Sequence, residues 1–413
     1  MGKKHLIIGC GTAALSAIRK IREVNSSDEV SLVTMETHAP YSPAALPYLI
    51  SRRIRRTDLF VTDERYFDRM RCSLRRGTQV IQIVPDRKEV IYQDQSCDRY
   101  DSLLIASGSE PIRLEINGLD KVGFIGFHTM DDCERLLKLL VNKNEIAVYG
   151  GGLVALEIAA ALIEGGYRVH IIVRSYIARQ YLGKRASGIV EGIFRTHGCK
   201  IHSGTEVGAV GKKKGKIEIA LTSGETIAAD LFVVSTGVRS RTFFLENSGI
   251  KINRGIEVDR RMRTNISGVY AAGDVAEAPD FFNNQPGINP IAPNALQQGR
   301  IAGANMVGEE LQDSGWISMN LFKFFGHSAF SIGPPPDGSS QVFCDEHESD
   351  QCHKELIFSD KRLIGARFLD IDIDPGVIRY LIENKVDVER YKELLFEKPK
   401  GISRWLMLES ERR

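Results

Sequence analysis

Hydrophobic and polar positions at the start of the chain change period twice within about 35 residues. The stretch "KKHLIIGCGTAALSAIRKIR" opens on an apolar run, His5 to Ile8. Apolar residues at helical spacing follow at Leu15, Ile18 and Ile21. A second run, "EVSLVTME", then ends at Glu36. The pattern predicts a strand, a helix and a second strand joined by a glycine turn.

The same pattern returns about 140 residues later in "NEIAVYGGGLVALEIAAALIEGGYRVHIIVR". A strand at 146–149 precedes a helical segment through Ile158 and Leu162, and a strand at 168–173 follows. Three further stretches read as buried strands that end in turns: "YDSLLIASGSEP", "ADLFVVSTGVRS" and "GVYAAGDVAE". This order predicts an α/β chain with two Rossmann-like dinucleotide-binding domains.

Each glycine turn fits a dinucleotide phosphate group. Gly9 allows the tight turn, Gly11 lets a pyrophosphate approach the backbone, and Ala14 keeps helix and strand close. The phosphates would then meet the free amides at the helix N-terminus. We expect the first loop to bind through Gly9, Gly11, Thr12, Ala13 and Ala14. Glu36 ends the second strand and can accept hydrogen bonds from a ribose.

The second loop is expected to bind through Gly150, Gly152, Leu153 and Val154. Here the second strand ends at Arg174 rather than at an acid. A guanidinium at this position suits the 2′-phosphate of NADP, but it can also stack on an adenine or lie in solvent.

Composition indicates a globular protein and argues against several other classes. The 413 residues, 43% hydrophobic and 26% charged, predict two to four globular domains. A net charge of +2 gives no reason to expect nucleic-acid or membrane binding, and no apolar run approaches the roughly 20 residues of a membrane helix. Strand-like sequence begins at once, so we expect no signal peptide. Seven cysteines without a CxxC pair predict a reducing, cytoplasmic setting and no iron–sulfur or zinc site.

On these motifs the chain resembles the pyridine nucleotide–disulfide oxidoreductase superfamily, in the branch of NADH oxidases, coenzyme A-disulfide reductases and ferredoxin or rubredoxin reductases. The resemblance implies FAD and NAD as cofactors, with NADP second. It places Asp274 on the flavin ribityl chain and Glu157 beside the nicotinamide. The helix in "APNALQQGRIAGANMVG" would approach the flavin through Ala295 and Gln298. The other cofactor contacts implied are Pro47, Ser107, Gly108, Thr236, Gly237 and Gly273.

The resemblance also implies a domain order. FAD-binding segments are expected at 1–115 and 242–316, an inserted NAD(P)-binding domain at 116–241, and an α+β interface domain at 317–413. In the last domain, 354–369 reads as a hairpin and 374–387 as a helix that begins at a proline. Phe324, Phe325 or His327 would either approach the flavin or pack in the core.

The segment "PYSPAALPYLISRRIRR" departs from the family. Ala44 stands where coenzyme A-disulfide reductases carry a cysteine, and Pro43 and Tyr48 replace the Arg and Lys of rubredoxin-reductase relatives. Without a local thiol, electrons must pass to oxygen, a small oxidant or a partner. Cys72 or Cys97 would have to fold back to act as a substitute. Tyr48 and Glu157 are the candidate catalytic residues.

We favour an iron–sulfur or ferredoxin-like partner, because the chain looks most like FAD subunits of phenylglyoxylate dehydrogenase-like or aldehyde oxidoreductase complexes. A free-standing NADH oxidase or ferredoxin/rubredoxin reductase is the first alternative, and a non-catalytic redox-sensing flavoprotein is the second. The arginines of 52–56, with those of 69–76, form either a solvated face or a docking patch for an acidic partner.

Overall fold

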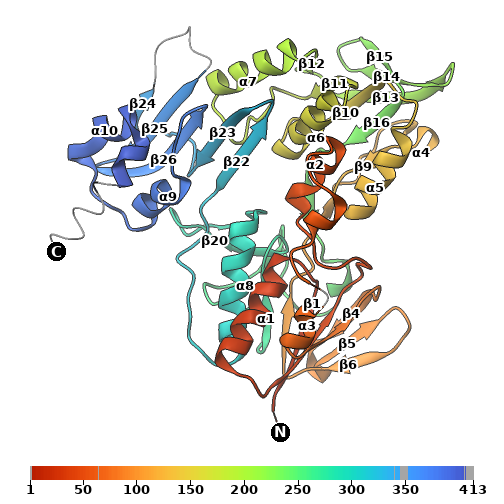
Figure 1. The fold of residues 1–413 in the computed structure, drawn as a ribbon. Helices are drawn as coiled ribbons and strands as arrows, with labels where there is room; N and C mark the ends of the chain where they lie inside the picture. Colours follow the sequence, from red (N-terminus) through yellow and green to blue (C-terminus); the bar gives the residue numbers. More distant parts are fainter. Residues whose placement is uncertain (1, 64, 339, 345–351, 404, 406–413) are drawn as a thin grey trace. The chain divides into compact units, whose positions relative to one another are not determined.

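The computed structural model describes residues 2–63, 65–338, 340–344, 352–403 and 405. The chain forms two compact units. The first comprises residues 1–114, 128–134 and 237–317, and the second comprises 115–127, 135–236 and 318–413. Figure 1 follows the chain through these elements. The α/β class predicted from the strand and helix periods is confirmed.

A five-stranded parallel sheet forms the centre of the first unit, in the order β19-β7-β1-β2-β3. Its middle strands are buried apolar runs, as expected for a parallel sheet covered on both faces. The strands are β19 (Val269–Ala271), β7 (Ser102–Ile105), β1 (Lys4–Ile8), β2 (Glu29–Val33) and β3 (Cys72–Arg75).

Helices α1 (Thr12–Val24) and α8 (Ala292–Met306) lie side by side against this sheet (Figure 1). A Cβ atom at Gly299 would come within 2.1 Å of the Ala13 carbonyl oxygen, and one at Gly303 within 2.6 Å of the Ala17 oxygen. The two glycines therefore let the helix backbones approach closely.

Short elements complete the first unit. The antiparallel ribbon of β8 and β17 pairs Ser109–Pro111 with Val238–Ser240. The remaining elements are α2 (Leu46–Ile50), α3 (Tyr66–Arg69), β4 (Val80–Val84), β5 (Glu89–Tyr92), β6 (Cys97–Arg99), β18 (Ile256–Glu257), β20 (Ala276–Pro279) and β21 (Pro286–Gly287).

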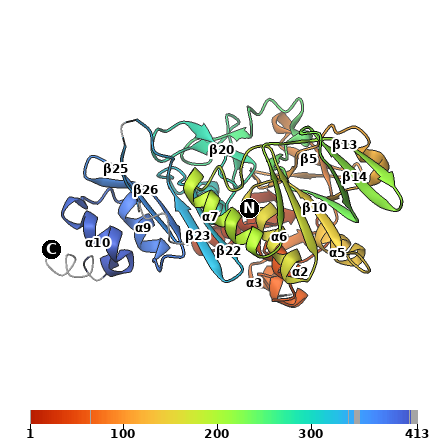
Figure 2. The ribbon, with the colours of Figure 1, turned by 90° about the horizontal axis from the view of Figure 1, so that it is seen from above.

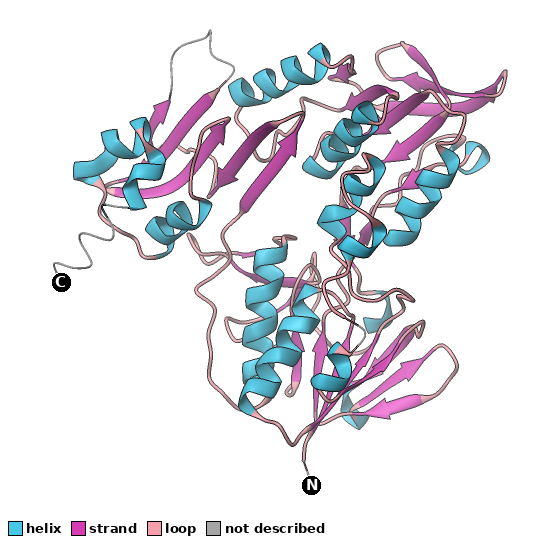
Figure 3. Ribbon diagram, in the orientation of Figure 1, coloured by secondary structure: helices cyan, strands magenta, loops and turns pink. Residues whose placement is uncertain are grey.

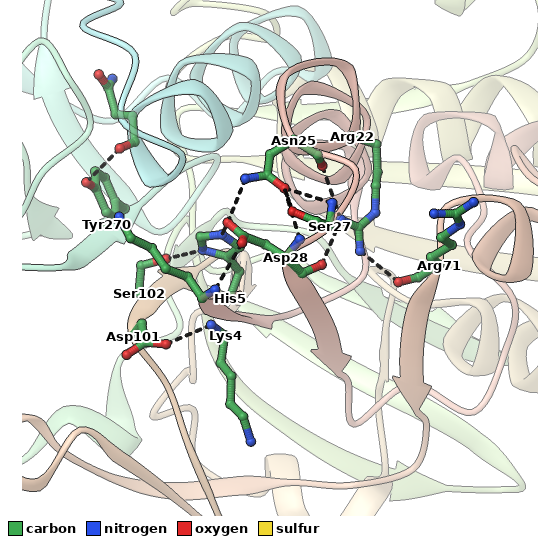
Figure 4. A network of polar contacts seen from close by, with 12 residues as sticks. Lys4, His5, Arg22, Asn25, Ser27, Asp28, Arg71, Asp101, Ser102 and Tyr270 are labelled. Atoms are coloured by element: carbon green, nitrogen blue, oxygen red, sulfur yellow. Dashed lines mark hydrogen bonds and ion pairs between the residues drawn. The ribbon is translucent and has the colours of Figure 1, made fainter. Parts of the chain in front are cut away.

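A buried polar network ties three parts of the first unit together (Figure 4). The two ring nitrogens of His5 lie 2.6 Å from the Ser102 hydroxyl and 2.9 Å from an Asp28 carboxylate oxygen. The Lys3 amide also donates to Asp28. Burial would raise the pKa of Asp28, but the hydrogen bonds from His5 and Lys3 together lower it. The network joins β1 to β7 and to the entry of β2.

Replacing Asp28 with alanine is expected to lower the free energy of unfolding by about 1–3 kcal/mol, since buried donors lose their acceptor. Denaturant titration measures this, with the exposed Asp101→Ala as the control. A carboxyl with a lowered pKa stabilises the fold above its unfolded-state pKa and loses that contribution as the pH falls below about 4. The free energy of unfolding should therefore fall less steeply with decreasing pH in Asp28→Ala than in the wild type. Equal slopes in the two proteins would contradict this role of Asp28.

The second unit contains a parallel sheet in the order β12-β11-β10-β16-β9. Its strands are β12 (Lys200–Ser203), β11 (Arg168–Val173), β10 (Glu145–Tyr149), β16 (Leu231–Val234) and β9 (Ile125–Gly126). The helices nearby in sequence are α4 (Leu119–Val122), α6 (Leu153–Glu164) and α7 (Lys184–Thr196). Helix α5 (Met130–Leu139) is divided, with residues 130–134 in the first unit and 135–139 in the second. An antiparallel sheet is formed by β13 (Val207–Lys213), β14 (Lys216–Leu221) and β15 (Thr226–Ala229).

The C-terminal part of the second unit is an antiparallel sheet in the order β22-β23-β26-β25-β24. Figures 2 and 3 show its strands beside the C-terminal helices. The elements are β22 (Met319–Phe324), β23 (His327–Ile332), β24 (Gln341–Cys344), β25 (His353–Ser359), β26 (Arg362–Leu369), α9 (Pro375–Glu383) and α10 (Lys392–Glu397). The predicted hairpin and the helix that begins at a proline are both confirmed.

The aromatic residues of the β22–β23 hairpin contact α7. Phe324 is fully buried, and its ring stacks on those of Phe194 and Phe322. The rings of Phe325 and His197 stack with centroids 4.0 Å apart. Of the two roles expected for Phe324, packing in the core is therefore the one seen within this unit.

Candidate functional site

The first glycine turn leaves a backbone cradle at the start of α1. Gly9 has a φ of +102°, and a Cβ there would lie 2.1 Å from the Ala106 carbonyl oxygen. Gly11 is the N-cap of α1, and nothing lies within 4 Å of the place a Cβ would take. Thr12, Ala13 and Ala14 form the first turn, which has no acidic side chain. The free amides of this turn can receive a phosphate.

The second glycine turn repeats this geometry at the start of α6. Gly150 has a φ of +142°, and a Cβ there would lie 2.1 Å from the Ser235 carbonyl oxygen. Gly152 is the N-cap and faces open space. Leu153 and the exposed Val154 begin the helix, again without an acid in the first turn. Both helix N-termini are thus open to anions.

Asp274 follows β19 and is held by several hydrogen bonds. The Ser109 hydroxyl donates to its carboxylate at 3.0 Å, and the Ser240 hydroxyl donates to its backbone oxygen at 2.9 Å. Burial raises the pKa of Asp274. Ser109 and Ser240 belong to the β8–β17 ribbon, so the ribbon fixes the position of this carboxylate. Sequence reasoning missed both serines, although each lies in a strand-and-turn stretch that it had identified.

Gln298 on α8 holds the neighbouring residue. Its side-chain oxygen accepts the Gly273 amide at 2.8 Å, while its side-chain nitrogen is buried without a hydrogen-bond partner among the residues that the structure describes. A buried donor of this kind lacks an acceptor that a bound flavin can supply. Ala295, one turn earlier on α8, is also buried, and its Cβ lies 3.6 Å from the position of a Cβ at Gly273. These residues fit the predicted flavin site.

Glu36 lies just beyond β2 and is half-buried. Burial raises the pKa of its carboxyl, and the Asp131 carboxylate raises it further. The carboxyl can accept hydrogen bonds from hydroxyl groups, as the sequence suggested.

The turn residues predicted to line the cofactors follow β7 and β16. The Ser107 hydroxyl donates to the Arg241 carbonyl oxygen at 2.9 Å, and Gly108, with a φ of +70°, borders open space. Gly237 has a φ of +120°. The Thr236 hydroxyl, described within the second unit, is buried without a hydrogen-bond partner among the described residues.

The segment at 43–50 forms a short helical turn followed by α2. Ala44 is exposed, whereas Pro47 is buried and Tyr48 half-buried within the first unit. The thiol of Cys133 lies 3.6 Å from the Leu46 carbonyl oxygen. Sequence reasoning missed this neighbour, because 87 residues separate the two positions.

Three cysteines of the first unit have little thiolate character. Burial, the largest influence, raises the pKa of Cys10, Cys72 and Cys133 to about 12. Cys97 is exposed on β6. Because the thiolate is the reactive form, these three thiols are unreactive near neutral pH.

Glu157 lies on α6 in the second unit. Burial alone raises the pKa of its carboxyl to about 7, and no hydrogen bond or ion pair with another described residue offsets this. It can therefore change charge near neutral pH.

Arg174, in the same unit, is exposed at the end of β11, 3.7 Å from the Glu206 carboxylate. The negative charge of Glu206 would repel the 2′-phosphate of NADP at this position.

The two cradles define a protein that binds two dinucleotides. The family described as pyridine nucleotide-disulphide oxidoreductase matches residues 3–299, and the chain belongs to this family. It is an NAD(P)H-dependent flavoprotein oxidoreductase whose cofactors are FAD and NAD(H). No described helix is both long and apolar enough to cross a membrane.

Three relatives illustrate the similarity. The NADH-dependent phenylglyoxylate dehydrogenase subunit epsilon of Aromatoleum evansii is 32% identical, over 99% of this chain and 98% of the relative. The NADH oxidase of Methanocaldococcus jannaschii is 29% identical, over 74% of this chain and 70% of the relative. In the covalent putidaredoxin reductase–putidaredoxin complex, one chain shares the fold with a TM-score of 0.88 at 21% identity, and the match covers 96% of each chain.

Proposed function

We propose that the chain exchanges hydride between NAD(H) and FAD and single electrons with an iron–sulfur partner, as a subunit of a 2-oxoacid or aldehyde oxidoreductase complex. The observation that carries this proposal is the similarity, over nearly the whole of both chains, to a subunit of an NADH-dependent dehydrogenase. A flavin supplies the conversion between two-electron and one-electron transfer that side chains do not provide.

The residues would divide the work of holding the two cofactors. Gly9, Gly11 and the first turn of α1 would bind the FAD pyrophosphate, and Glu36 the adenosine ribose. Asp274, set by Ser109 and Ser240, would accept a hydrogen bond from the ribityl chain. The remaining flavin contacts proposed are Pro47, Tyr48, Ser107, Gly108, Gly237, Gly273, Ala295 and Gln298. The NAD contacts proposed are Gly150, Gly152, Leu153, Val154, Glu157, Arg174 and Thr236.

The proposal assigns no redox role to a cysteine. Ala44 occupies the position at which related disulfide reductases carry their thiol, and it cannot hold electrons. Cys133, whose thiol lies 3.6 Å from the Leu46 carbonyl oxygen, is fully buried, and its pKa of about 12 keeps it protonated. Electrons would therefore leave the flavin for a separate acceptor.

Glu157 should make the rate of flavin reduction by NADH depend on pH. A carboxylate beside the nicotinamide would stabilise the positive charge that develops as hydride leaves NADH. Because the pKa of Glu157 is about 7, the group is ionised above that pH and neutral below it. The rate of anaerobic flavin reduction by NADH is expected to rise as the pH increases through about 7.

Stopped-flow reduction of Glu157→Gln should show a flat profile over the same pH range. Glu164→Gln, at the other end of α6, is the matched control and should keep the wild-type profile. An unchanged profile in Glu157→Gln would remove Glu157 from this role.

The arginine-rich segment offers a docking surface, although part of its charge is neutralised. Arg55 pairs with Asp58 at 3.0 Å, and Arg56 with Glu134 at 2.8 Å. Arg52 is exposed and forms no ion pair with any other residue that the structure describes. Charge at this surface would guide encounter with an acidic partner more than it would add affinity.

Untagged purification from the native host tests the partner directly, because an iron–sulfur protein should co-elute with the flavoprotein. Electron exchange with that protein should slow as salt is added and in Arg52→Glu. Lys212→Glu, the same charge change at an exposed position of β13 in the second unit, is the control. A flavoprotein that elutes without any iron–sulfur protein would contradict the proposal.

A free-standing NADH oxidase is the second candidate, favoured by the similarity to the archaeal NADH oxidase. It predicts rapid oxygen consumption with NADH as the only other substrate. A redox-sensing flavoprotein would instead turn over slowly with every acceptor.

A further inference from the structure

Two neighbouring strands of the C-terminal sheet bring together three metal-ligating side chains. Cys344, the last residue of β24, is paired directly with Glu355 on β25. His353 precedes Glu355 by two residues, and alternation along a strand puts both on the same face. The thiol sulfur, an imidazole nitrogen and a carboxylate oxygen all lie within 4.8 Å of one another.

The surroundings orient these groups. Arg367, opposite Glu355 on β26, donates to Oε1 of its carboxylate. The other oxygen, Oε2, lies 4.0 Å from Nε2 of His353. The His353 side chain is only 2% exposed. Arg367 therefore fixes Glu355 through Oε1 and leaves Oε2 to face the site. Metal ligands are commonly oriented in this way by a hydrogen bond from a second residue.

The donor set selects the class of ion. Thiolate, imidazole and carboxylate together suit zinc, which binds all three at about 2.0–2.3 Å, whereas magnesium and calcium take oxygen ligands. Ligand atoms within 4.8 Å of one another need only a small contraction to meet around one ion. Thiolate and carboxylate each carry a negative charge that attracts a divalent cation, and the Arg367 guanidinium offsets part of the carboxylate charge.

We propose that Cys344, His353 and Glu355 bind one zinc ion, with water as the fourth ligand. The ion would fasten the edge strand β24 to β25 and so stabilise the C-terminal sheet. Nothing in the proposal depends on FAD, NAD or the electron acceptor. The sequence predicts no metal centre because its cysteines lack CxxC spacing, and only the strand register brings these three residues together.

Equilibrium dialysis of the full-length, FAD-loaded protein against zinc tests the site. The wild type should retain about one zinc ion per chain after removal of weakly bound metal. Cys344→Ser and His353→Asn should each weaken zinc binding by at least about tenfold. Cys97→Ser, which removes an exposed cysteine of the first unit, is the control and should bind zinc as the wild type does.

Thermal unfolding and cobalt spectra provide independent readouts. Zinc should raise the melting temperature of the wild type and of Cys97→Ser but not of Cys344→Ser, because a ligand stabilises only the state that binds it. Cobalt in place of zinc should give tetrahedral visible bands that disappear in Cys344→Ser. If His353→Asn fails to fold, the partly exposed Cys344→Ser variant still decides the matter. Wild-type zinc affinity in Cys344→Ser, or no zinc uptake by the wild type, would overturn the proposal.

Discussion

The Asp274→Ala protein is expected to purify with little of the yellow colour of the wild type. In the proposed site the buried carboxylate, which also accepts a hydrogen bond from the Ser109 hydroxyl, accepts a hydrogen bond from the ribityl chain. Losing a hydrogen bond to a charged group costs about 1.5–3 kcal/mol, which corresponds to roughly a tenfold to hundredfold weaker affinity for FAD. The absorbance ratio of flavin to protein, followed by titration of the apoprotein with FAD, measures the loss.

Two further variants sharpen this result. Ser109→Ala removes the hydroxyl that orients the carboxylate, so a smaller loss of flavin affinity is expected. Asp86→Ala removes an exposed carboxylate from a turn of the same unit and should bind FAD normally. Full flavin content and unchanged affinity in Asp274→Ala would remove Asp274 from the flavin site.

Alkylation of every accessible cysteine is expected to leave electron transfer from NADH to a dye essentially intact. The thiols of Cys10, Cys72 and Cys133 are protonated near neutral pH, and the proposed function places Ala44 where related disulfide reductases carry a cysteine. A disulfide reductase treated in its reduced form would lose nearly all of its disulfide-reducing activity, because its thiolate is the group that attacks the disulfide. Dye reduction before and after treatment measures the effect.

Cys133→Ser removes the thiol that donates to the Leu46 carbonyl oxygen at the start of α2. The serine hydroxyl of this variant can still donate to the Leu46 carbonyl oxygen, so α2 should keep its position. Electron transfer from NADH to the dye should then stay at the wild-type level. Strong inactivation by alkylation, matched by loss of activity in Cys133→Ser, would show that this thiol takes part in the chemistry.

Much of the fold could be predicted because its signals are local. The glycines at 9 and 150 follow short apolar strands, and both occupy left-handed backbone against a neighbouring carbonyl group. A side chain cannot fit there, so the residue type reports the turn directly. The hairpin at 354–369 and the helix beginning at Pro375 were likewise readable from turn and cap residues.

Contacts between segments far apart in the sequence could not be predicted from such local signals. Ser109 and Ser240 meet Asp274 only because β8 and β17 form a ribbon beside the end of β19. Residues 128–134 group with the first unit, where His38 lies 2.7 Å from the Asp131 carboxylate, and no composition change marks this segment. The register of β24 and β25, which pairs Cys344 with Glu355, also has no local signal.

Anaerobic titration of the FAD-loaded protein with NADH tests the central claim most directly. A flavoprotein whose only redox centre is FAD takes up one hydride equivalent per flavin. The flavin spectrum should then bleach in one phase, without the long-wavelength band that a thiolate against the flavin produces. Uptake of two hydride equivalents per flavin, with such a band after the first, would show that a cysteine pair shares the electrons and would contradict transfer to a separate partner.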